Sequence, residues 1–382
     1  MKKRYLFTPG PTPLPPEILS ALSRPIIHHR TKDYQEIFSR VNEDLKYLFQ
    51  TKNPVFTFAS SGTGAMECAV LNLTEEGEEA LAIVGGKFGE RWKEILEEWG
   101  RKCKVLEVEW GAAPLPEEVG GILEENPHIK VVFSTLCETS TGTKTDIEAL
   151  AKVVRESEGI LVVDAISGLG AMELRTDDWG VDVVVAGSQK GMMLPPGLSF
   201  ISLSDKAWDK VKRNKRKGYY WNLEKMYSSY QKNDTPFTPA VSLVVALAEA
   251  LRIIREEGLE NIWRKFAIIS RAVREGVKAL GLKIFSQVPA EAVTAVKVPL
   301  GVDGVKLYQV MKDKIGVQVA GGQAQLKGKI IRIAHMGYQD YTDALLVVSA
   351  LEMALSFLEY PVDKGKGTGR VMEILLEEGV FA

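Results

Sequence analysis

Short apolar runs alternate with amphipathic stretches along much of the chain. The runs that have the length and β-branched content of buried strands are VFTFA (55–59), EALAIVG (79–85), KVVFSTL (130–136), GILVVDA (159–165), VDVVVAGS (181–188) and LSFISLS (198–204). Most of the stretches between them place their apolar residues at helical spacing, as in GTGAMECAVLNL and DIEALAKVVRES. Because strands that alternate with helices form βαβ units, this pattern predicts an α/β fold with a mostly parallel sheet.

The pattern changes near residue 258. A long apolar helix in VSLVVALAEALRIIREEG leads into a second helix that Gly281 is expected to cap, and shorter strands and helices follow, among them a strand at KIFS (283–286). We therefore expect a large domain at 21–257 and a smaller α+β domain at 258–382. An extended arm at 1–20 precedes them, because FTPGPTPLPPE carries five prolines. The tail after residue 363 resembles a linker with a short amphipathic turn, and no role is predicted for it.

Composition narrows the class of protein. With 45% hydrophobic and 26% charged residues, the 382-residue chain can bury a large core. A net charge of −2 argues against nucleic acid or an anionic membrane as a partner. The three cysteines, Cys68, Cys103 and Cys137, lack paired spacing, which argues against a zinc site or a disulfide framework. Because the chain shows no secretory signal and no apolar run long enough to span a bilayer, we expect a cytoplasmic protein. We expect no bound metal.

Three polar features lie at the carboxyl ends of predicted strands, where parallel α/β sheets bind ligands. ASSGTGAMEC (59–68) places serines, glycine and threonine at a helix N-terminus, which is either an anion site or a plain helix cap. Asp164 is either a turn cap or an acid held ionised beside a cation. Lys190 is either a lysine whose stem packs at a strand end or a reactive amine. Together, a phosphate cradle, an acid and a lysine are the parts that a pyridoxal phosphate site requires.

The motifs that carry these residues resemble the class V aminotransferases, which are fold type I pyridoxal phosphate enzymes. They are most similar to the alanine–glyoxylate and serine–pyruvate aminotransferase branch. The matching stretches cover almost the whole chain: FTPGPTPLPPEI, SSGTGAMEC, GGKFGERW, ETSTGT, VVDAISGLG, GSQKGMMLPPG, TPFTPAVSL and GKIIRIAHMG. The resemblance implies transfer of an amino group from serine, alanine or aspartate to glyoxylate or pyruvate.

The resemblance also implies a role for individual residues. Lys190 would bind the cofactor covalently and move the proton, and Asp164 would pair with the pyridine nitrogen. The remaining cofactor contacts would come from Ser61, Gly62 and Thr63 with Gln189 beside them (phosphate), Phe88 and Ile166 (the two ring faces) and Thr139 (the 3-oxygen). Phe88 stands where this branch often has tryptophan, and a phenylalanine can still stack.

Two further regions complete the implied site. Arg332 matches the arginine that binds the substrate α-carboxylate, for which a planar guanidinium is suited, and Gly10 would border the substrate pocket. Thr235 or Thr238, both in TPFTP, would reach the phosphate of the other subunit. The resemblance thus implies a homodimer with a shared active site.

Other functions stay open at this point. One is a phosphoserine or other class V transaminase, and another is a non-catalytic interaction subunit that has kept the fold. A cysteine desulfurase needs a nucleophilic cysteine near the small domain, and no cysteine follows Cys137. The sequence does not fix the preferred amino donor, because a single methylene changes the free energy of discrimination by only about 1–3 kcal/mol.

Overall fold

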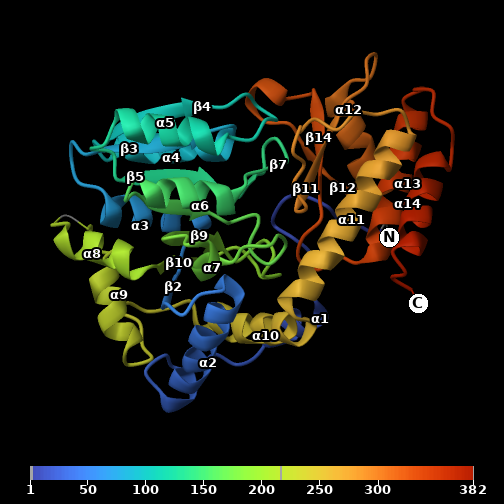
Figure 1. Ribbon diagram of the computed structural model, residues 1–382. Helices are drawn as coiled ribbons and strands as arrows, with labels where there is room; N and C mark the ends of the chain where they lie inside the picture. The colour runs from blue at the N-terminus through green and yellow to red at the C-terminus, as the bar shows by residue number, and fades with distance from the viewer. Residues whose placement is uncertain (1–2, 216, 382) are drawn as a thin grey trace.

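A seven-stranded sheet organises the amino-terminal part of the chain (Figure 1). The computed structural model describes residues 3–215 and 217–381. The strands in spatial order are β2 (Val55–Phe58), β10 (Ser199–Leu203), β9 (Val183–Gly187), β8 (Ile160–Asp164), β5 (Val131–Thr135), β3 (Glu79–Val84) and β4 (Lys102–Glu107). Only β10 runs antiparallel to its neighbours, and the other pairs are parallel. The predicted α/β fold with a mostly parallel sheet is confirmed.

Helices cover both faces of this sheet because its strands are apolar on both sides. In β9, Val183 and Val185 point into one core cluster, whereas Val184 and Ala186 point into the other. The first cluster is shared with α3 (Gly62–Leu73), α4 (Lys87–Glu98), α8 (Asp205–Arg213) and α9 (Leu223–Tyr230). The second is shared with α2 (Lys32–Phe49), α5 (Pro116–Glu125), α6 (Ile147–Glu156) and α10 (Val241–Glu257). In such sheets ligands bind beyond the carboxyl ends of the parallel strands.

A smaller α+β unit follows α10 and lies beside the sheet (Figure 1). Its three antiparallel strands are β11 (Val293–Lys297), β14 (Ile330–Ala334) and β13 (Ala320–Gly321). They pack with α11 (Leu259–Ala279), α12 (Gly304–Gln309), which continues as a π-helical turn over Val310–Ile315, and α13 (Tyr341–Phe357). The helix after α10 thus begins at the boundary predicted near 258, although the apolar core continues from one unit into the other.

The strand predicted at 283–286 is wrong. The stretch forms a single isolated bridge, between Ile284 and Val296, and the chain then leaves the edge of the sheet. Beyond Phe285, whose N–H still bonds to Ala295 O in β11 (2.8 Å), Gln287 N bonds to Gly111 O instead (2.7 Å). The tertiary contact with the large domain replaces the ladder that the apolar pattern predicted.

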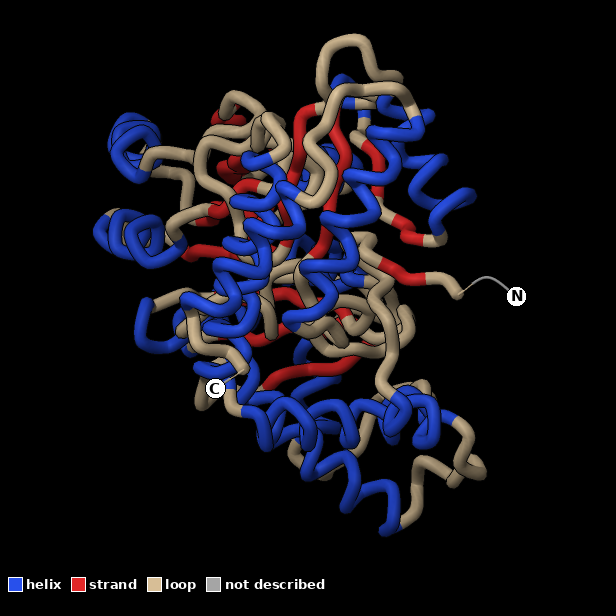
Figure 2. The backbone as a smooth tube through the Cα atoms, turned by 90° about the vertical axis from the view of Figure 1, so that its right-hand side faces the viewer, coloured by secondary structure: helices blue, strands red, loops and turns tan. Residues whose placement is uncertain are grey.

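The N-terminal arm links the two units. Its strand β1 (Tyr5–Leu6) pairs in parallel with β12 (Val317–Gln318) in the small unit, at the side of the molecule that faces the viewer in Figure 2. The arm then crosses to the large unit, where α1 (Pro16–Leu22) packs against α10. Proline at the first turn suits this helix start, because its missing N–H has no helical partner there. The crossing brings residues 7–12 past the carboxyl edge of the sheet.

The C-terminal tail forms a helix, α14 (Lys366–Glu377), and the predicted short turn is wrong. Its apolar residues Val371, Ile374 and Leu375 are buried against α11 and α13. Buried Glu352 in α13 accepts hydrogen bonds from the backbone N–H groups of Gly365 and Thr368 (3.1 and 3.0 Å) and so caps the helix. An amphipathic stretch becomes helical here because a neighbouring helix supplies both the apolar surface and the cap.

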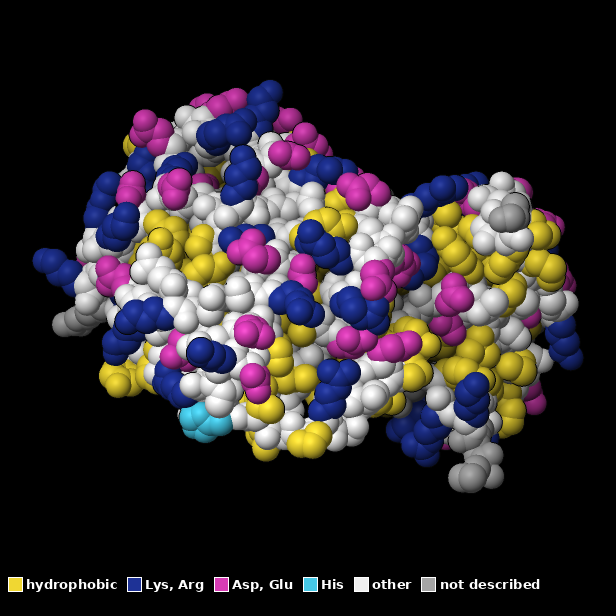
Figure 3. Space-filling model, turned by 90° about the horizontal axis from the view of Figure 1, so that it is seen from below, with side chains coloured by type: hydrophobic (Ala, Val, Ile, Leu, Met, Phe, Trp, Pro, Cys, Tyr) yellow, Lys and Arg dark blue, Asp and Glu magenta, His cyan; other side chains and the backbone are white. Residues whose placement is uncertain are grey.

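Charges of both signs are interspersed on the face seen in Figure 3. The basic stretch at 206–217 includes most of α8, and four of its lysines lie within ion-pair distance of carboxylates, among them Lys210 with Glu78 and Lys217 with Glu224. Within residues 3–215 and 217–381, no helix is long and apolar enough to cross a membrane.

Candidate active site

Lys190 lies just beyond the carboxyl end of β9 and is buried, with 7% of its surface exposed. Its Nζ donates to Pro9 O and to Ser167 Oγ (3.3 Å), which are uncharged acceptors. Burial lowers the pKa of Lys190 to about 8, although the negative charge of Asp164 opposes that change. A lysine with a lowered pKa has a neutral, nucleophilic form at mildly alkaline pH, which an ordinary surface lysine lacks.

Asp164 ends β8, next to β9 in the sheet, and is 3% exposed. Its Oδ1 accepts a hydrogen bond from Ile166 N (2.8 Å). Burial raises the pKa of Asp164 to about 7, while that hydrogen bond lowers it. Among the described residues no cation forms an ion pair with Asp164. A buried carboxyl group without a cation partner can pair with a protonated ring nitrogen. The positive charge of that nitrogen would stabilise the ionised form of the carboxyl group.

A chain of hydrogen bonds joins Lys190 to the small domain. Ser167 Oγ, which contacts Lys190, accepts from Thr139 Oγ1 (2.7 Å), and Thr139 O accepts from Arg332 Nη1 (3.0 Å). Arg332 lies in β14 and its Nε also donates to Gly321 O (3.0 Å). Burial lowers the pKa of Arg332 to about 10, which still leaves it charged at neutral pH. The predicted substrate arginine therefore lies within three hydrogen bonds of the predicted catalytic lysine.

The N-terminus of α3 lies at the same edge. Ser61 is the N-cap but its side chain makes no capping bond, and Gly62 and Thr63 form the first turn. Gly62 has no room for a side chain, because a Cβ there would lie 2.5 Å from Ile166 Cδ1. Gln189 reaches this region, where its Oε1 is buried without a hydrogen-bond partner. The predicted phosphate residues are thus together, with a helix N-terminus whose donors are left for an anion.

Phe88 is in the first turn of α4 and is half-buried, so its ring is not enclosed in the core. Glu138 in β6 (Cys137–Glu138) holds this turn: its Oε2 accepts from Phe88 N (3.0 Å) and Gly89 N (2.9 Å). Burial raises the pKa of Glu138, and its hydrogen bonds with Ser140 and with these backbone N–H groups lower it. One buried carboxylate therefore fixes the turn that carries the predicted ring-stacking residue. It belongs to the residue that directly precedes Thr139 in the chain.

Gly10 lies directly against Lys190. Its φ of +84° is in the left-handed region, and a Cβ there would lie 2.5 Å from Lys190 Cδ and Cε. The neighbouring carbonyl of Pro9 accepts the Nζ–H bond, and Thr12 Oγ1 donates to Lys190 O (3.1 Å). The N-terminal arm therefore lies directly against Lys190.

Thr235 and Thr238 lie apart from this cluster, in the segment before α10. Thr235 is buried and donates its hydroxyl hydrogen to Phe237 O (2.7 Å). Thr238 is exposed and borders a shallow surface pocket of about 730 Å³ together with His28 and His29. Within one chain, the structure gives neither threonine a contact with the other site residues that it describes.

Sequence reasoning missed Ser167, Glu138 and Pro9. Ser167 stands in VVDAISGLG and Glu138 in ETSTGT, so a search of the quoted motifs for every residue with a side-chain hydroxyl or carboxylate could have found both. Pro9 acts through its backbone carbonyl, which no residue type announces. Its position depends on the path of the arm and on nothing local.

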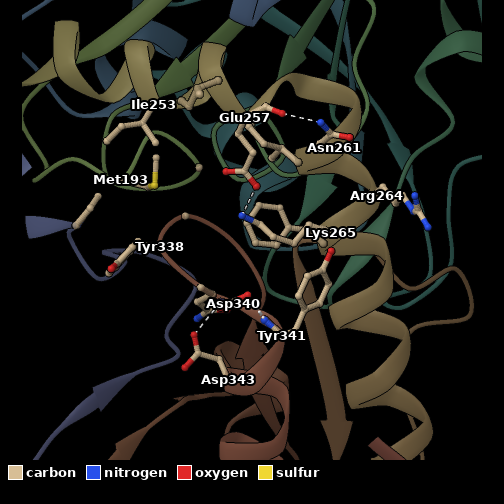
Figure 4. Close-up of a pocket in the computed structure, with 18 of the residues that line it drawn as sticks. Met193, Ile253, Glu257, Asn261, Arg264, Lys265, Tyr338, Asp340, Tyr341 and Asp343 are labelled. Carbon is tan, nitrogen blue, oxygen red and sulfur yellow. Dashed lines mark hydrogen bonds and ion pairs between the residues drawn. The ribbon is translucent and has the colours of Figure 1, made fainter. Parts of the chain in front are cut away.

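A second cavity, of about 910 Å³, lies between the two units (Figure 4). It is lined by the α10–α11 junction, where Lys265 pairs with Glu257, and by residues 337–341. Gly191 and Met193 also line it, and they are the described lining residues nearest in sequence to Lys190. The cavity therefore borders the segment that follows Lys190 but is not lined by Lys190 itself. We do not assign the candidate site to it.

The residues gathered around Lys190 fit pyridoxal phosphate. The fit rests on two groups: the amine of Lys190, whose hydrogen bonds go to neutral oxygens, and the buried carboxyl group of Asp164, which has no ion-pair partner among the described residues. Glycines at positions 10 and 62 keep the adjoining space open. In the described part of the chain, no group of three or more His, Cys, Asp or Glu residues could hold a metal ion.

Comparison with known families agrees with this arrangement. The family model described as aminotransferase class-V matches residues 4–338. This chain belongs to the class V aminotransferase family. Members of that family use pyridoxal phosphate, and the chain is accordingly an aminotransferase.

Individual relatives are similar over nearly their whole length. The L-aspartate–glyoxylate aminotransferase of Paracoccus denitrificans is 33% identical, with 96% of this chain and 95% of that protein covered. The small subunit of a soluble hydrogenase from a Synechococcus species is 39% identical, with 94% of each chain covered. The ureidoglycine–glyoxylate aminotransferase of Bacillus subtilis superposes with a TM-score of 0.94 at 28% identity, with 98% of each chain covered.

Proposed function

We propose that this aminotransferase transfers the amino group of a small amino acid, such as serine, alanine or aspartate, to glyoxylate or pyruvate. The observation that carries the proposal is the hydrogen-bonded path from Lys190 through Ser167 and Thr139 to Arg332. This path supports a site in which Lys190 acts as the reactive amine and Arg332 as the cation that binds a carboxylate. The named activity of the Paracoccus relative supports the substrate class.

Each residue has a defined task in the proposed reaction. Pyridoxal phosphate, when bound, supplies the aldehyde that takes the amino group and the ring that draws electrons from Cα. Arg332 binds the substrate α-carboxylate and so orients Cα, and Lys190 Nζ takes the Cα proton and later returns it. Asp164 holds the ring nitrogen in its protonated form, because its ionised state gains a cation partner there. Ser61, Gly62, Thr63 and Gln189 hold the phosphate, Phe88 and Ile166 flank the ring, and Thr139 contacts its 3-oxygen.

We further propose a homodimer in which Thr238 reaches the phosphate in the other subunit. Thr238 is exposed, whereas the hydroxyl group of Thr235 already has an acceptor in its own chain. Nearby Ile26 is 75% exposed, which is costly for a large apolar side chain that has no partner surface. The domains 21–257 and 258–382 and the arm 1–20 remain the division that we propose for each subunit, and a cytoplasmic location is proposed with them.

A panel of amino donors against glyoxylate, pyruvate and 2-oxoglutarate tests the substrate class. We expect the purified protein to take up pyridoxal phosphate with the visible absorbance of a lysine-bound aldehyde, and a small amino acid to bleach it. Turnover confined to 2-oxoglutarate or to O-phosphoserine would reject the proposed acceptors or donors. Light scattering of the purified protein in solution tests the dimer, which a single-chain mass would reject.

The hydrogenase-subunit name of the Synechococcus relative favours one second candidate, an interaction subunit that has kept the fold. The same spectroscopic experiment separates the two functions. A protein that binds no pyridoxal phosphate, or whose bound cofactor never reacts with any amino acid, is not a transaminase. Lys190 and Arg332 each contact a residue of the hydrogen-bonded path between them, and the charge of Asp164 acts on Lys190. The presence of all three residues in one cluster supports the enzyme.

A further inference from the structure

Arg91 is a cation to which neither the sequence motifs nor the contacts described above give a role. It lies in α4, one turn after Phe88, and is half-buried. Its guanidinium carbon is 4.9 Å from the centroid of the Phe88 ring, and its Nη1 donates to Thr63 Oγ1 (3.3 Å). The same helix therefore carries both a ring-stacking candidate and a cation at the predicted phosphate residues.

Arg91 has no carboxylate partner, unlike the other basic residues of its helix. Lys87 pairs with Glu90 and also lies within ion-pair distance of Glu94, and Lys93 pairs with Glu97. Three of the four acids on α4 thus lie within ion-pair distance of the two lysines. Within the described residues no Asp or Glu forms an ion pair with Arg91. A partly desolvated guanidinium without a counter-ion is unfavourable, which indicates that an anion from outside the chain completes the contact.

The N-terminus of α3 supplies the rest of an anion site. Thr63, which accepts the hydrogen bond from Arg91, is in the first turn of that helix, and the N-cap Ser61 makes no side-chain capping bond. The positive end of the helix dipole and the unused backbone donors therefore face the same region as the guanidinium.

The charge of Arg91 also reaches the two catalytic candidates. Burial is the main influence on the pKa of Asp164 and of Lys190, and the positive charge of Arg91 lowers both values. A cation that acts on both groups lies near them and not on a remote surface. An anion next to Arg91 would reduce this effect, so occupancy of the anion site and the protonation of the catalytic pair are linked.

We propose that Arg91 is the counter-charge for a phosphate bound at the N-terminus of α3, which its guanidinium holds together with the hydroxyl group of Thr63. The inference rests on the proposed function, because that phosphate belongs to the pyridoxal phosphate. Stacking on Phe88 orients the guanidinium, since cation–π contact fixes its plane. Arg91 thereby contacts both the phosphate and Phe88, the residue proposed to stack on the cofactor ring.

The test compares two ligands that differ only in the phosphate. Cofactor-free protein is titrated with pyridoxal 5′-phosphate and with pyridoxal, and binding is followed by absorbance and tryptophan fluorescence. For Arg91→Ala we expect an affinity loss of about 10- to 100-fold for pyridoxal 5′-phosphate, the range typical of one charge-assisted contact. We expect little change for pyridoxal, and Arg91→Lys should recover part of the loss. Lys93→Ala, which removes a paired and exposed lysine of the same helix, is the matched control.

The outcomes separate the inference from the function on which it rests. If the wild type binds no pyridoxal 5′-phosphate, the proposed function fails. If the wild type binds it and Arg91→Ala loses affinity equally for both ligands, Arg91 acts only through Phe88 and the inference is overturned. Unchanged affinity for both ligands overturns it as well.

A further arm identifies the source of the phosphate. If Arg91→Lys leaves cofactor affinity intact but weakens only O-phosphoserine as a substrate or inhibitor of the holoenzyme, the anion is a substrate group and the inference is overturned. Should Arg91→Ala fail to fold, Arg91→Gln keeps the size of the side chain without its charge and gives the same comparison.

Discussion

Replacing Arg332 by lysine tests the substrate-binding role of the buried arginine. Nε and Nη1 each donate to a backbone carbonyl, of Gly321 and of Thr139, which fixes the guanidinium plane. Nη2 has no such bond to a described residue, so it and the second hydrogen of Nη1 can bind a carboxylate side by side. Lysine would keep a positive charge but lose both the plane and the paired contact.

The size of the loss follows from these contacts. A hydrogen bond to a charged group contributes about 1.5–3 kcal/mol, and each ~1.4 kcal/mol is tenfold in rate. Losing one such contact while keeping the charge gives an expected fall in kcat/KM of about 10- to 100-fold for Arg332→Lys. Because the carboxylate is common to all amino acids, serine, alanine and aspartate should be affected by a similar factor.

The assay pairs each amino acid with its amide, which lacks the carboxylate. Steady-state kcat/KM is measured for wild type and Arg332→Lys with alanine and with alaninamide. We expect the large loss only with alanine, so that the two changes are not additive, as in a double-mutant cycle. If alaninamide loses as much as alanine, Arg332 acts by supporting Thr139 and the reasoning is refuted.

Three other changes test the site and its support. In the cofactor-free protein the pKa of Asp164 is about 7 when folded against 3.8 as a free group, so the folded state holds the extra proton between these values. Urea unfolding at several pH values should therefore show that the free energy of unfolding of the wild type falls relative to that of Asp164→Asn as the pH rises from 3.8 to about 7. Above about pH 7 the difference between the two free energies should stay constant. A difference that does not change with pH anywhere in this range would contradict the burial argument. Gly10→Ala should abolish covalent cofactor uptake, seen as lost visible absorbance, because its Cβ collides with Lys190, whereas Gly77→Ala, at a similar φ but in open space, should leave uptake intact. Glu352→Ala should lower the free energy of unfolding by about 0.5–2 kcal/mol and speed amide exchange at the start of α14, and slow exchange there would show that packing alone holds the helix.

The sequence determined most of the fold of the large domain and the positions of Asp164 and Lys190 at its sheet edge. Parallel strands with apolar residues on both faces have one arrangement that buries them, with helices on each side. Asp164 is the last residue of one such strand and Lys190 follows another. Because β8 and β9 are neighbours, the two residues lie at the same edge of the sheet. The N-terminal turn of α3 followed from the same rule.

Only the tertiary structure decided what surrounds that pair. Arg332 and the arm residue Gly10 come from segments far from Lys190 in sequence, and packing between domains brings them together. Burial then shifts the pKa of Lys190 downward and that of Asp164 upward, and no local pattern reports burial of this depth. The failed predictions, the strand at 283–286 and the short turn in the tail, have the same cause. Their neighbours in space supply hydrogen-bond partners and apolar surface that the local sequence does not contain.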